Sequence, residues 1–282
     1  MRTIKSISTL QKILYRARSQ NKKIGFVPTM GALHEGHLSL IRKCRRQNDV
    51  AVLSIFVNPK QFGPREDFSK YPRDLKRDEM FAKKEKVDII FYPSVDVVYP
   101  NGYLTYVEVE TVSRILCGKF RPGHFKGVTT IVSKLLNLIQ PDVLYLGQKD
   151  AQQAVIIQKM IHDLHFPVQV KICPTIREKD GLAMSSRNKY LKQQERHQAL
   201  KIYRSLRLAK QEIRRGERNP KRIIQRMCRC IGKARNIKME YIECVEARSL
   251  KPLSRLHGKV LIALAVHIGK TRLIDNVIVS VK

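Results

Sequence analysis

Phe26-Val27-Pro28-Thr29-Met30-Gly31-Ala32-Leu33-His34-Glu35-Gly36-His37-Leu38-Ser39-Leu40-Ile41 is the stretch of the sequence that decides the fold. The apolar run at residues 24–27, bounded by Pro28, predicts a buried strand. Leu38, Leu40, Ile41 and Cys44 recur at helical spacing among basic residues and predict a helix with one apolar face. A strand, a glycine-containing turn and a helix start present free backbone N–H groups, which favour a phosphate.

Two histidines and two glycines lie in this turn. Gly31 and Gly36 permit close backbone approach. His34 and His37 are three residues apart, so on the first helical turn both imidazoles point the same way as the free N–H groups. A lone histidine is more often a packed or surface residue, and a lone glycine-rich turn is weak support for a site. The combination after a strand is much less expected by chance and indicates a phosphate-binding turn.

The composition is that of a globular protein. Of the 282 residues, 43% are hydrophobic, enough for a large core. No apolar run approaches the length of a membrane span, and the first residues lack the apolar core of a secretory signal. The six cysteines are scattered without zinc-ligand spacing, so we expect free thiols and a cytoplasmic location.

Positive charge is in large excess, with 55 Lys and Arg against 24 Asp and Glu, a formal net charge of +31. Such an excess suits binding to nucleic acid or to an anionic membrane. The basic residues are nevertheless spread over the whole chain, with no dense run of aromatics among them and no recognised nucleic-acid-binding motif. We therefore expect neither partner, and attribute the charge to a general surface bias that also attracts anionic substrates.

Strands and helices alternate over the first two-thirds of the chain. We expect strands at residues 51–57, 87–92, 143–146 and 168–173, a peripheral strand at 104–109, and helices at 10–17, 74–86, 129–139 and 151–164. Residues 120–128 indicate a loop rich in glycine, aromatic and cationic residues. This order predicts an α/β fold with a Rossmann-like, doubly wound, mostly parallel sheet.

The pattern changes near Pro174. A loop-like segment at residues 175–191 precedes helices at 195–214 and 223–234 and strands at 241–245, 260–266 and 272–279. We predict two domains, a Rossmann-like domain at residues 1–183 and a smaller C-terminal α/β domain at residues 184–282.

Four further stretches carry polar residues in predicted loops and at element ends. They are Phe56-Val57-Asn58-Pro59-Lys60-Gln61-Phe62-Gly63 with Glu66-Asp67 and Tyr71-Pro72-Arg73, Arg121-Pro122-Gly123-His124-Phe125-Lys126-Gly127, Gly147-Gln148-Lys149-Asp150-Ala151-Gln152-Gln153, and Thr175-Ile176-Arg177-Glu178 through Ser185-Ser186-Arg187-Asn188. Together with the first stretch, they resemble the pantoate–β-alanine ligase (pantothenate synthetase) family. His-x-Gly-His by itself resembles the nucleotide-binding motif of adenylate-forming nucleotidyltransferases. Any one match is weak, but five in order make the resemblance specific.

The resemblance implies an ATP-dependent, two-step ligation. Pantoate's carboxylate attacks the α-phosphate of ATP, giving pantoyl adenylate and pyrophosphate, and the amine of β-alanine then attacks the acyl carbon, releasing AMP and pantothenate. The resemblance also implies a C-terminal lid that closes over ATP and a homodimer. Magnesium is expected to accompany ATP through phosphate oxygens and waters, without a dedicated protein cage.

The same resemblance assigns roles to individual residues. His34 and His37 are expected to be catalytic, with His37 as proton donor. The residues expected to bind ATP are Met30, Gly31, Ala32, Leu33, His34, Glu35, Gly36 and His37, then Gly147, Gln148, Lys149 and Asp150, and finally Ile176, Met184, Ser185, Ser186 and Arg187. Asn58, Gln61 and Gln153 are expected to bind pantoate and β-alanine. Arg121 and His124 are weaker candidates that line or stabilise the pocket wall.

Two residues depart from the family pattern Gly-Glu-Lys-Asp-Tyr-Gln-Gln, where this chain has Gln148 and Ala151. We expect activity to survive, because Lys149, Asp150 and Gln153 remain. Two rival functions are disfavoured, the first by Asn58, Gln61 and Gln153, and the second by the intact histidines, Lys149 and Arg187. A nucleotidyltransferase that ends at a dinucleotide-like product would keep the fold, and an RNA-binding protein on a retired enzyme fold would account for the charge.

Overall fold

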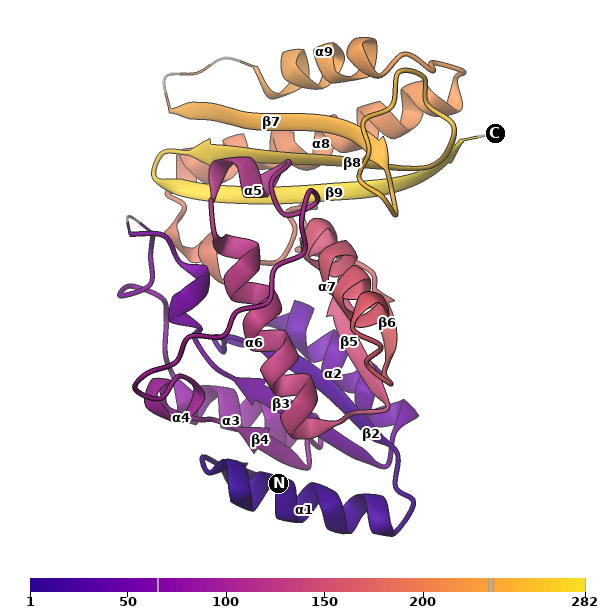
Figure 1. The fold of residues 1–282 in the computed structure, drawn as a ribbon. Coiled ribbons are helices and arrows are strands. Elements are labelled where there is room, and N and C mark those ends of the chain that lie inside the picture. The colour runs from indigo at the N-terminus through magenta and orange to yellow at the C-terminus, as the bar shows by residue number, and fades with distance from the viewer. Residues whose placement is uncertain (65, 233, 235, 282) are drawn as a thin grey trace. The chain divides into compact units, whose positions relative to one another are not determined.

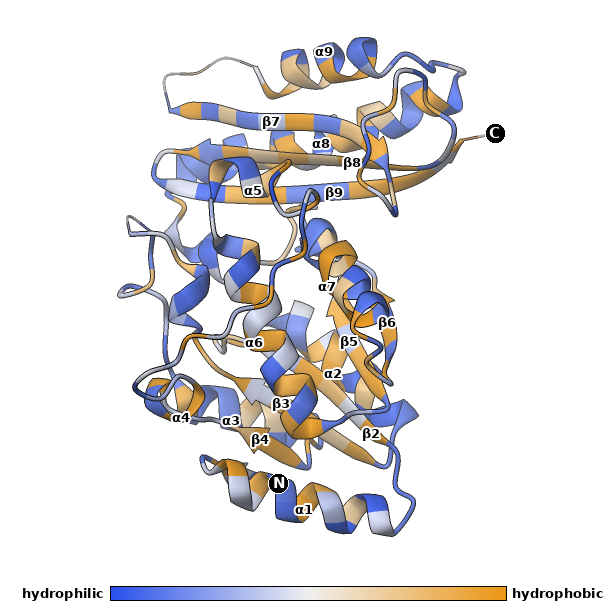
Figure 2. Cartoon of the chain, viewed as in Figure 1, coloured by the Kyte–Doolittle hydropathy of each residue, from blue (hydrophilic) through white to orange (hydrophobic). Residues whose placement is uncertain are grey.

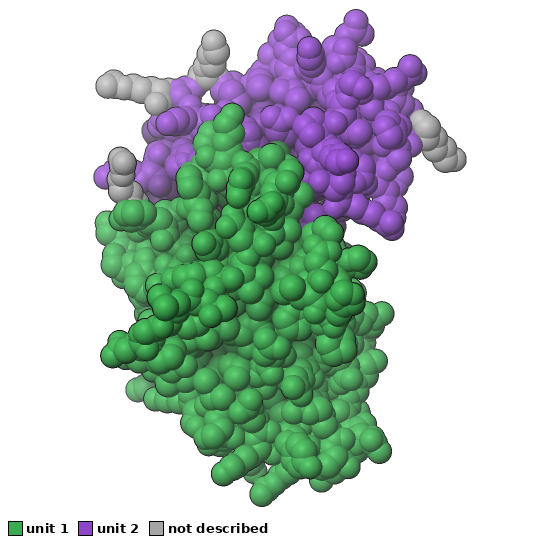
Figure 3. Space-filling view, in the orientation of Figure 1, with its two compact units in different colours: residues 1–147, 156–174 green, residues 148–155, 175–282 purple. Residues whose placement is uncertain are grey.

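The computed structural model describes residues 1–64, 66–232, 234 and 236–281. The chain forms two compact units (Figure 3). The first contains Met1–Gly147 and Ile156–Pro174, and the second contains Gln148–Val155 and Thr175–Lys282. Each unit has its own cluster of buried apolar side chains. The domain boundary between residues 183 and 184 stays a prediction.

The first unit is built on a six-stranded parallel sheet. In spatial order the strands are β1 (Arg2–Ile4), β4 (Ile89–Phe91), β3 (Val50–Ile55), β2 (Ile24–Thr29), β5 (Val143–Gly147) and β6 (Gln169–Cys173). Every residue of β3 is buried, as expected for a central parallel strand covered on both faces. Figure 2 shows the corresponding apolar colour along β2 and β3. The predicted α/β class with a doubly wound parallel sheet is confirmed.

Helices cover both faces of this sheet (Figure 1). Helix α2 packs against α3 on one face, and α1 packs against α6 on the other. Right-handed crossovers explain this arrangement. The chain moves across the sheet in one direction from β2 to β3 and from β3 to β4, and in the other direction from β4 to β5, so the connecting helices lie on opposite faces. The helices of this part of the chain are α1 (Ile7–Ser19), α2 (Glu35–Gln47), α3 (Leu75–Lys84), α4 (Val95–Val98), α5 (Cys117–Phe120), α6 (His124–Ile139) and α7 (Ala151–Asp163), with short 3-10 turns η1 (Pro59–Gln61) and η2 (Gln148–Asp150).

The strand order reverses at β2, which has β3 on one side and β5 on the other. Because all strands are parallel, the segments that follow β2, β3 and β5 leave from the same edge of the sheet. Doubly wound sheets bind ligands at such a reversal point. The predicted Met30–His37, Asn58–Gln61 and Gly147–Asp150 segments are the segments that follow these three strands.

The second unit places two helices on an antiparallel sheet. The strands β7 (Ile237–Glu246), β8 (Gly258–Ile268) and β9 (Thr271–Val281) lie in that order, and α8 (Gln193–Arg214) and α9 (Pro220–Ile231) pack together and against them. A 3-10 turn, η3 (Ser186–Tyr190), precedes α8. Helix α9 begins at an Asn219 cap with Pro220 in its first turn, and buries Ile223, Met227 and Ile231 along one side. The predicted smaller α/β arrangement is confirmed.

Several local expectations differ from the structure. Residues 104–109 form no strand, because the Val107 N–H donates to Thr130 Oγ1 and its carbonyl accepts from Thr129. Helix α6 begins at His124, inside the predicted loop at residues 120–128. Strand β1 was not predicted, since three residues give no usable periodicity. The predicted helix at 223–234 includes residue 233, which lies outside the described residues. Among the described residues, no helix is both long and apolar enough to cross a bilayer.

Candidate active site

The turn after β2 is held by a buried carboxylate from α3. Asp78, 1% exposed, accepts the backbone N–H groups of Ala32 at 2.9 Å and Leu33 at 2.7 Å. Gly31 and Ala32 have φ values of +79° and +50°, so the chain turns sharply there. A Cβ on Gly31 would lie 2.8 Å from Asp78 Oδ2. Burial raises the pKa of Asp78, and its two N–H donors offset part of that rise.

His34 caps the helix that follows. Its Nδ1 accepts the Gly36 N–H at 3.1 Å, and its carbonyl accepts the N–H groups of His37 and Leu38. Since Nδ1 is an acceptor, the neutral imidazole carries its proton on Nε2. The ring centroids of His34 and His37 lie 4.1 Å apart. The structure therefore brings the two predicted catalytic histidines together.

The segment after β3 presents Gln61. Its Nε2 donates to the sulfur of Met30 at 3.1 Å, which joins this segment to the turn after β2. Asn58 lies behind it, 1% exposed, and donates from Nδ2 to Gln61 Oε1 at 3.1 Å and to the Gly127 carbonyl at 3.0 Å. Asn58 Oδ1 accepts from Tyr99 at 2.8 Å. These contacts make Asn58 a residue that orients the Gln61 amide.

An ion pair and a histidine fix the backbone of Gln61. Arg121 binds both carboxylate oxygens of Glu66, with Nε to Oε1 at 2.7 Å, and its Nη1 donates to His124 Nε2 at 3.0 Å. His124 Nδ1 donates to the Gln61 carbonyl at 2.8 Å, so the neutral ring carries its proton on Nδ1. Burial raises the pKa of Glu66, but the hydrogen bonds and the charge of Arg121 lower it by more. The pKa of Glu66 is therefore below its ordinary value. The two weaker candidates, Arg121 and His124, thus contact each other and the backbone carbonyl of Gln61.

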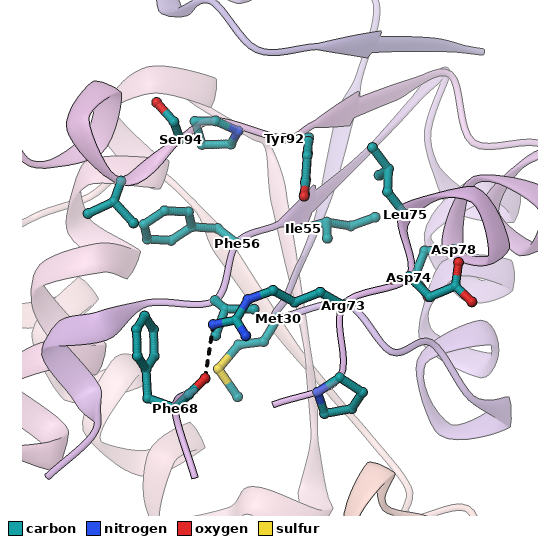
Figure 4. Close-up of a pocket in the computed structure, with 15 residues that line it drawn as sticks. Met30, Ile55, Phe56, Phe68, Arg73, Asp74, Leu75, Asp78, Tyr92 and Ser94 are labelled. Atoms are coloured by element: carbon teal, nitrogen blue, oxygen red, sulfur yellow. Dashed lines mark hydrogen bonds between the residues drawn. The ribbon is translucent and has the colours of Figure 1, made fainter. Parts of the chain in front are cut away.

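A cavity of about 190 Å³ lies beside the turn (Figure 4). Met30, Gly31 and Asp78 line it, together with Phe56 and other apolar side chains. In Figure 4 the Arg73 guanidinium points to the carbonyl of Phe68, to which it donates at 2.9 Å. Arg73 therefore closes the loop that bounds this cavity.

The second unit holds the turn after β5. Lys149 and Asp150 form an ion pair at 3.7 Å, both partly accessible. Asn276 of β9 donates from Nδ2 to the carbonyls of Gln148 and Lys149, each at 2.9 Å. Gln153 follows on α7 and is half-buried. The departure Gln148 contributes a long hydrogen bond to Asn276 Oδ1, at 3.4 Å.

The loop at residues 175–191 also belongs to the second unit. Met184 N–H donates to the Ile176 carbonyl at 3.0 Å, so two of the residues predicted to bind ATP are paired. Between them Arg177 forms a bridge with Ala183 and a bidentate ion pair with Asp275, at 2.6 and 3.0 Å. Ser185 Oγ accepts the Arg187 N–H at 3.3 Å and starts η3. Ser186 is half-buried in the same turn.

Sequence reasoning missed three residues that hold these segments, namely Asp78, Asp275 and Asn276. Asp78 occupies a buried position of α3. A carboxylate at such a position is unusual, and this was the signal that could have identified Asp78 as a residue with a specific role. Asp275 and Asn276 are likewise buried polar residues, on strand β9. The quoted stretches contain the site segments themselves, whereas these three side chains belong to α3 and β9.

The fold and this site define a class, α/β proteins that carry a His-x-Gly-His turn at the reversal point of a parallel sheet. Within it, the family model described as pantoate-beta-alanine ligase matches residues 2–278. The chain belongs to the pantoate-beta-alanine ligase family. The predicted family is confirmed, and with it the class of activity, a ligase.

Relatives match over their full length. A pantothenate synthetase of Caldicellulosiruptor saccharolyticus is 52% identical over 281 residues, covering 100% of each chain, and one of Moorella thermoacetica is 51% identical over 281 residues, covering 100% of this chain and 99% of the relative. A solved pantothenate synthetase of Thermus thermophilus is 40% identical with a TM-score of 0.94, covering 98% of this chain and 99% of the other. The Francisella tularensis pantoate-beta-alanine ligase, solved with beta-gamma ATP and beta-alanine, is 38% identical with a TM-score of 0.80, covering 98% and 97%.

Proposed function

We propose that this chain condenses pantoate with β-alanine at the expense of ATP, through a pantoyl adenylate. The observation that carries the proposal is the pair of adjacent imidazoles, His34 and His37, at the start of α2 after a central parallel strand. Family membership favours ligation over a nucleotidyltransferase that stops at a nucleotide product, and over RNA binding.

In the first step, a carboxylate oxygen of pantoate attacks the α-phosphorus and the bond to the bridging oxygen breaks, so pyrophosphate leaves. The reaction needs positioned donors for the charge on the phosphate oxygens more than covalent help. His34 supplies its Nε2 proton, since Nδ1 is used in the cap. His37 acts as the proton donor, and Lys149 and Arg187 neutralise phosphate charge.

In the second step, the amine of β-alanine attacks the acyl carbon of the adenylate. The acyl–phosphate bond breaks, AMP leaves with the bonding electrons, and the proton lost by the amine passes to water as the amide forms. Gln61 and Gln153 bind pantoate, and Asn58 sets the orientation of the Gln61 amide. Selection of this substrate comes from amide groups that its hydroxyls satisfy, because an analogue lacking them leaves the amides unpaired.

The remaining ATP contacts belong to the same proposal. They are Met30, Gly31, Ala32, Leu33, Glu35 and Gly36 around the turn, and Gly147, Gln148, Asp150, Ile176, Met184, Ser185 and Ser186. Magnesium bound with ATP would be held mainly by phosphate oxygens and water, and Asp150 is the carboxylate of the turn that could help to hold it. It would supply charge neutralisation on the phosphates. A homodimer, a lid role for residues 184–282 and a cytoplasmic location complete the proposal, the last supported by the six free cysteines.

The test is product formation. The enzyme should make AMP, pyrophosphate and pantothenate in equal amounts only when ATP, pantoate and β-alanine are all present. His37→Ala should reduce turnover by at least about 100-fold, the usual size of a general-acid contribution. His162→Ala, which removes an 85% exposed histidine on α7, is the matched control and should be as active as the parent. AMP release that ignores pantoate would contradict the proposal.

A further inference from the structure

Two neighbouring side chains of β9 hold two different loops of the second unit. Asn276 contacts the turn at residues 148–150, and Asp275 contacts the loop at residues 175–191. Both side chains are almost fully buried, Asp275 at 2% and Asn276 at 3% exposure. Successive residues of a strand point to opposite sides, so adjacent positions can serve two separate segments.

Asn276 fixes the backbone of the first loop. Its Nδ2 uses both hydrogens on carbonyls of consecutive residues, Gln148 and Lys149, at 2.9 Å each. The Gln148 side chain donates to the Asn276 Oδ1 at 3.4 Å, which selects the amide orientation with Nδ2 toward the carbonyls. The direction of the Lys149 and Asp150 side chains therefore depends on an amide from a strand more than 120 residues away.

Asp275 fixes the second loop through Arg177. The ion pair is bidentate, at 2.6 and 3.0 Å, and the Arg177 guanidinium stacks on Tyr203 at 3.8 Å. The same guanidinium donates to the Gly181 carbonyl at 3.2 Å. Arg177 follows Ile176 in the chain and pairs with Ala183 in an antiparallel bridge, and the Met184 N–H bonds the Ile176 carbonyl. The position of Arg177 therefore sets the positions of Ile176 and Met184.

Burying an ion pair and an amide gives little net stability, because the desolvation cost offsets the attraction. An apolar pair would pack this strand at least as well. The polar pair instead fixes the position of each loop along the strand, because each loop can form its hydrogen bonds with Asp275 or Asn276 in one position only. Asp275 Oδ1 also accepts the Asn276 N–H at 2.7 Å, which joins the two anchors.

We propose that Asp275 and Asn276 are positioning residues that set both nucleotide-binding loops of the second unit from one rigid strand. The inference rests on the proposed function, in which Lys149, Ile176, Met184 and Arg187 bind ATP. It predicts that damage to either residue weakens ATP binding specifically. A purely structural role predicts a loss of stability without that selectivity.

The experiment compares Asn276→Ala and Asp275→Asn with Glu240→Gln. Glu240 on β7 is the matched control, because it forms a part-buried ion pair at 2.8 Å with Arg272, which lies on β9 with Asp275 and Asn276, and bonds His267 of β8 at 2.6 Å, within the sheet. For each full-length variant we would measure KM for ATP and for pantoate, kcat, the melting temperature, and the Kd for α,β-methylene-ATP by calorimetry without either acid.

Asn276→Ala and Asp275→Asn should each raise the ATP KM and the analogue Kd at least tenfold, with the pantoate KM changed less than threefold. Glu240→Gln should lower the melting temperature but leave the ATP KM within twofold. If Asn276→Ala or Asp275→Asn does not fold, Asn276→Asp and Arg177→Lys probe the same contacts at conserved volume or charge. An unchanged analogue Kd in folded variants would overturn the proposal. A parent enzyme that binds the analogue but makes no pantothenate would contradict the proposed function alone.

Discussion

Asp78 Oδ1 accepts the backbone N–H of Leu33 at 2.7 Å, which ties helix α3 to the turn that carries both histidines. The second oxygen holds Ala32, and Thr29 Oγ1 accepts the Gly31 N–H at 3.2 Å. The turn is therefore fixed from two sides. The histidines owe their positions to a carboxylate that lies more than 40 residues further along the chain.

Asp78→Asn should lower kcat/KM by at least about tenfold and the free energy of unfolding by about 1–3 kcal/mol, the usual cost of unsatisfied buried donors. The NH₂ group of the asparagine would face the backbone N–H of Ala32 or of Leu33, and that N–H would lose its acceptor. Glu79→Gln on the same helix, which changes only a partly exposed hydrogen bond to Thr3, is the control and should change neither quantity appreciably. Denaturant unfolding and steady-state kinetics give both numbers, and a fully active Asp78→Asn enzyme would refute the role.

Substitutions at His34 should separate helix capping from chemistry. His34→Asn keeps a good cap acceptor, so its free energy of unfolding should stay within about 0.5 kcal/mol of the parent, whereas His34→Ala should lose about 1 kcal/mol. Both should lose turnover to a similar extent, because both lack the Nε2 proton. Denaturant titrations and turnover assays test this. If His34→Asn kept full activity, capping would be the only role of His34.

The ion pair between Glu66 and Arg121 makes stability depend on pH. The folded-state pKa of Glu66 is below the ordinary value of 4.5, so the pair contributes fully above that value and is lost as the pH falls through the lower folded pKa. The difference in unfolding free energy between the parent and Glu66→Gln should therefore shrink from about pH 5 to about pH 3. Chemical denaturation across that range measures it. A difference that grows on acidification would have the wrong sign.

Helix α6 approaches η1 closely at Gly127. A Cβ there would lie 2.2 Å from the Lys60 carbonyl oxygen and 2.6 Å from the Gln61 nitrogen, both backbone atoms. Gly127→Ala should cost about 1–3 kcal/mol of stability and raise the pantoate KM, since the backbone of Gln61 must move. Gly63→Ala, whose Cβ would have its nearest contacts with the Glu66 side chain at 3.7 Å, should change stability by less than about 0.5 kcal/mol. Equal stability of the two variants would contradict this packing argument.

The sequence was sufficient for features that repeat locally. The run at residues 50–55 is buried throughout, and the spacing of Leu38, Ile41 and Cys44 gave α2. The alternation of strands and helices along the chain predicted the parallel sheet. The short stretches identified the turns whose residues contact one another within each unit. One such contact is the hydrogen bond from Gln61 to the sulfur of Met30.

What escaped sequence reasoning depends on partners distant in the chain. Val107 lies in an extended segment, yet its backbone bonds go to threonine side chains of α6 instead of a strand. Asn276 and Gln148 are 128 residues apart, so no local pattern connects them. The roles of the predicted site residues, and the domain boundary at residue 183, remain predictions.

The most direct test of the central claim is exchange of radiolabelled pyrophosphate into ATP in the absence of β-alanine. An enzyme that activates pantoate on the His34–His37 turn should catalyse this exchange when pantoate is present, and should lose it in His37→Ala. Exchange that proceeds equally without pantoate, or that appears only after β-alanine is added, would contradict the account.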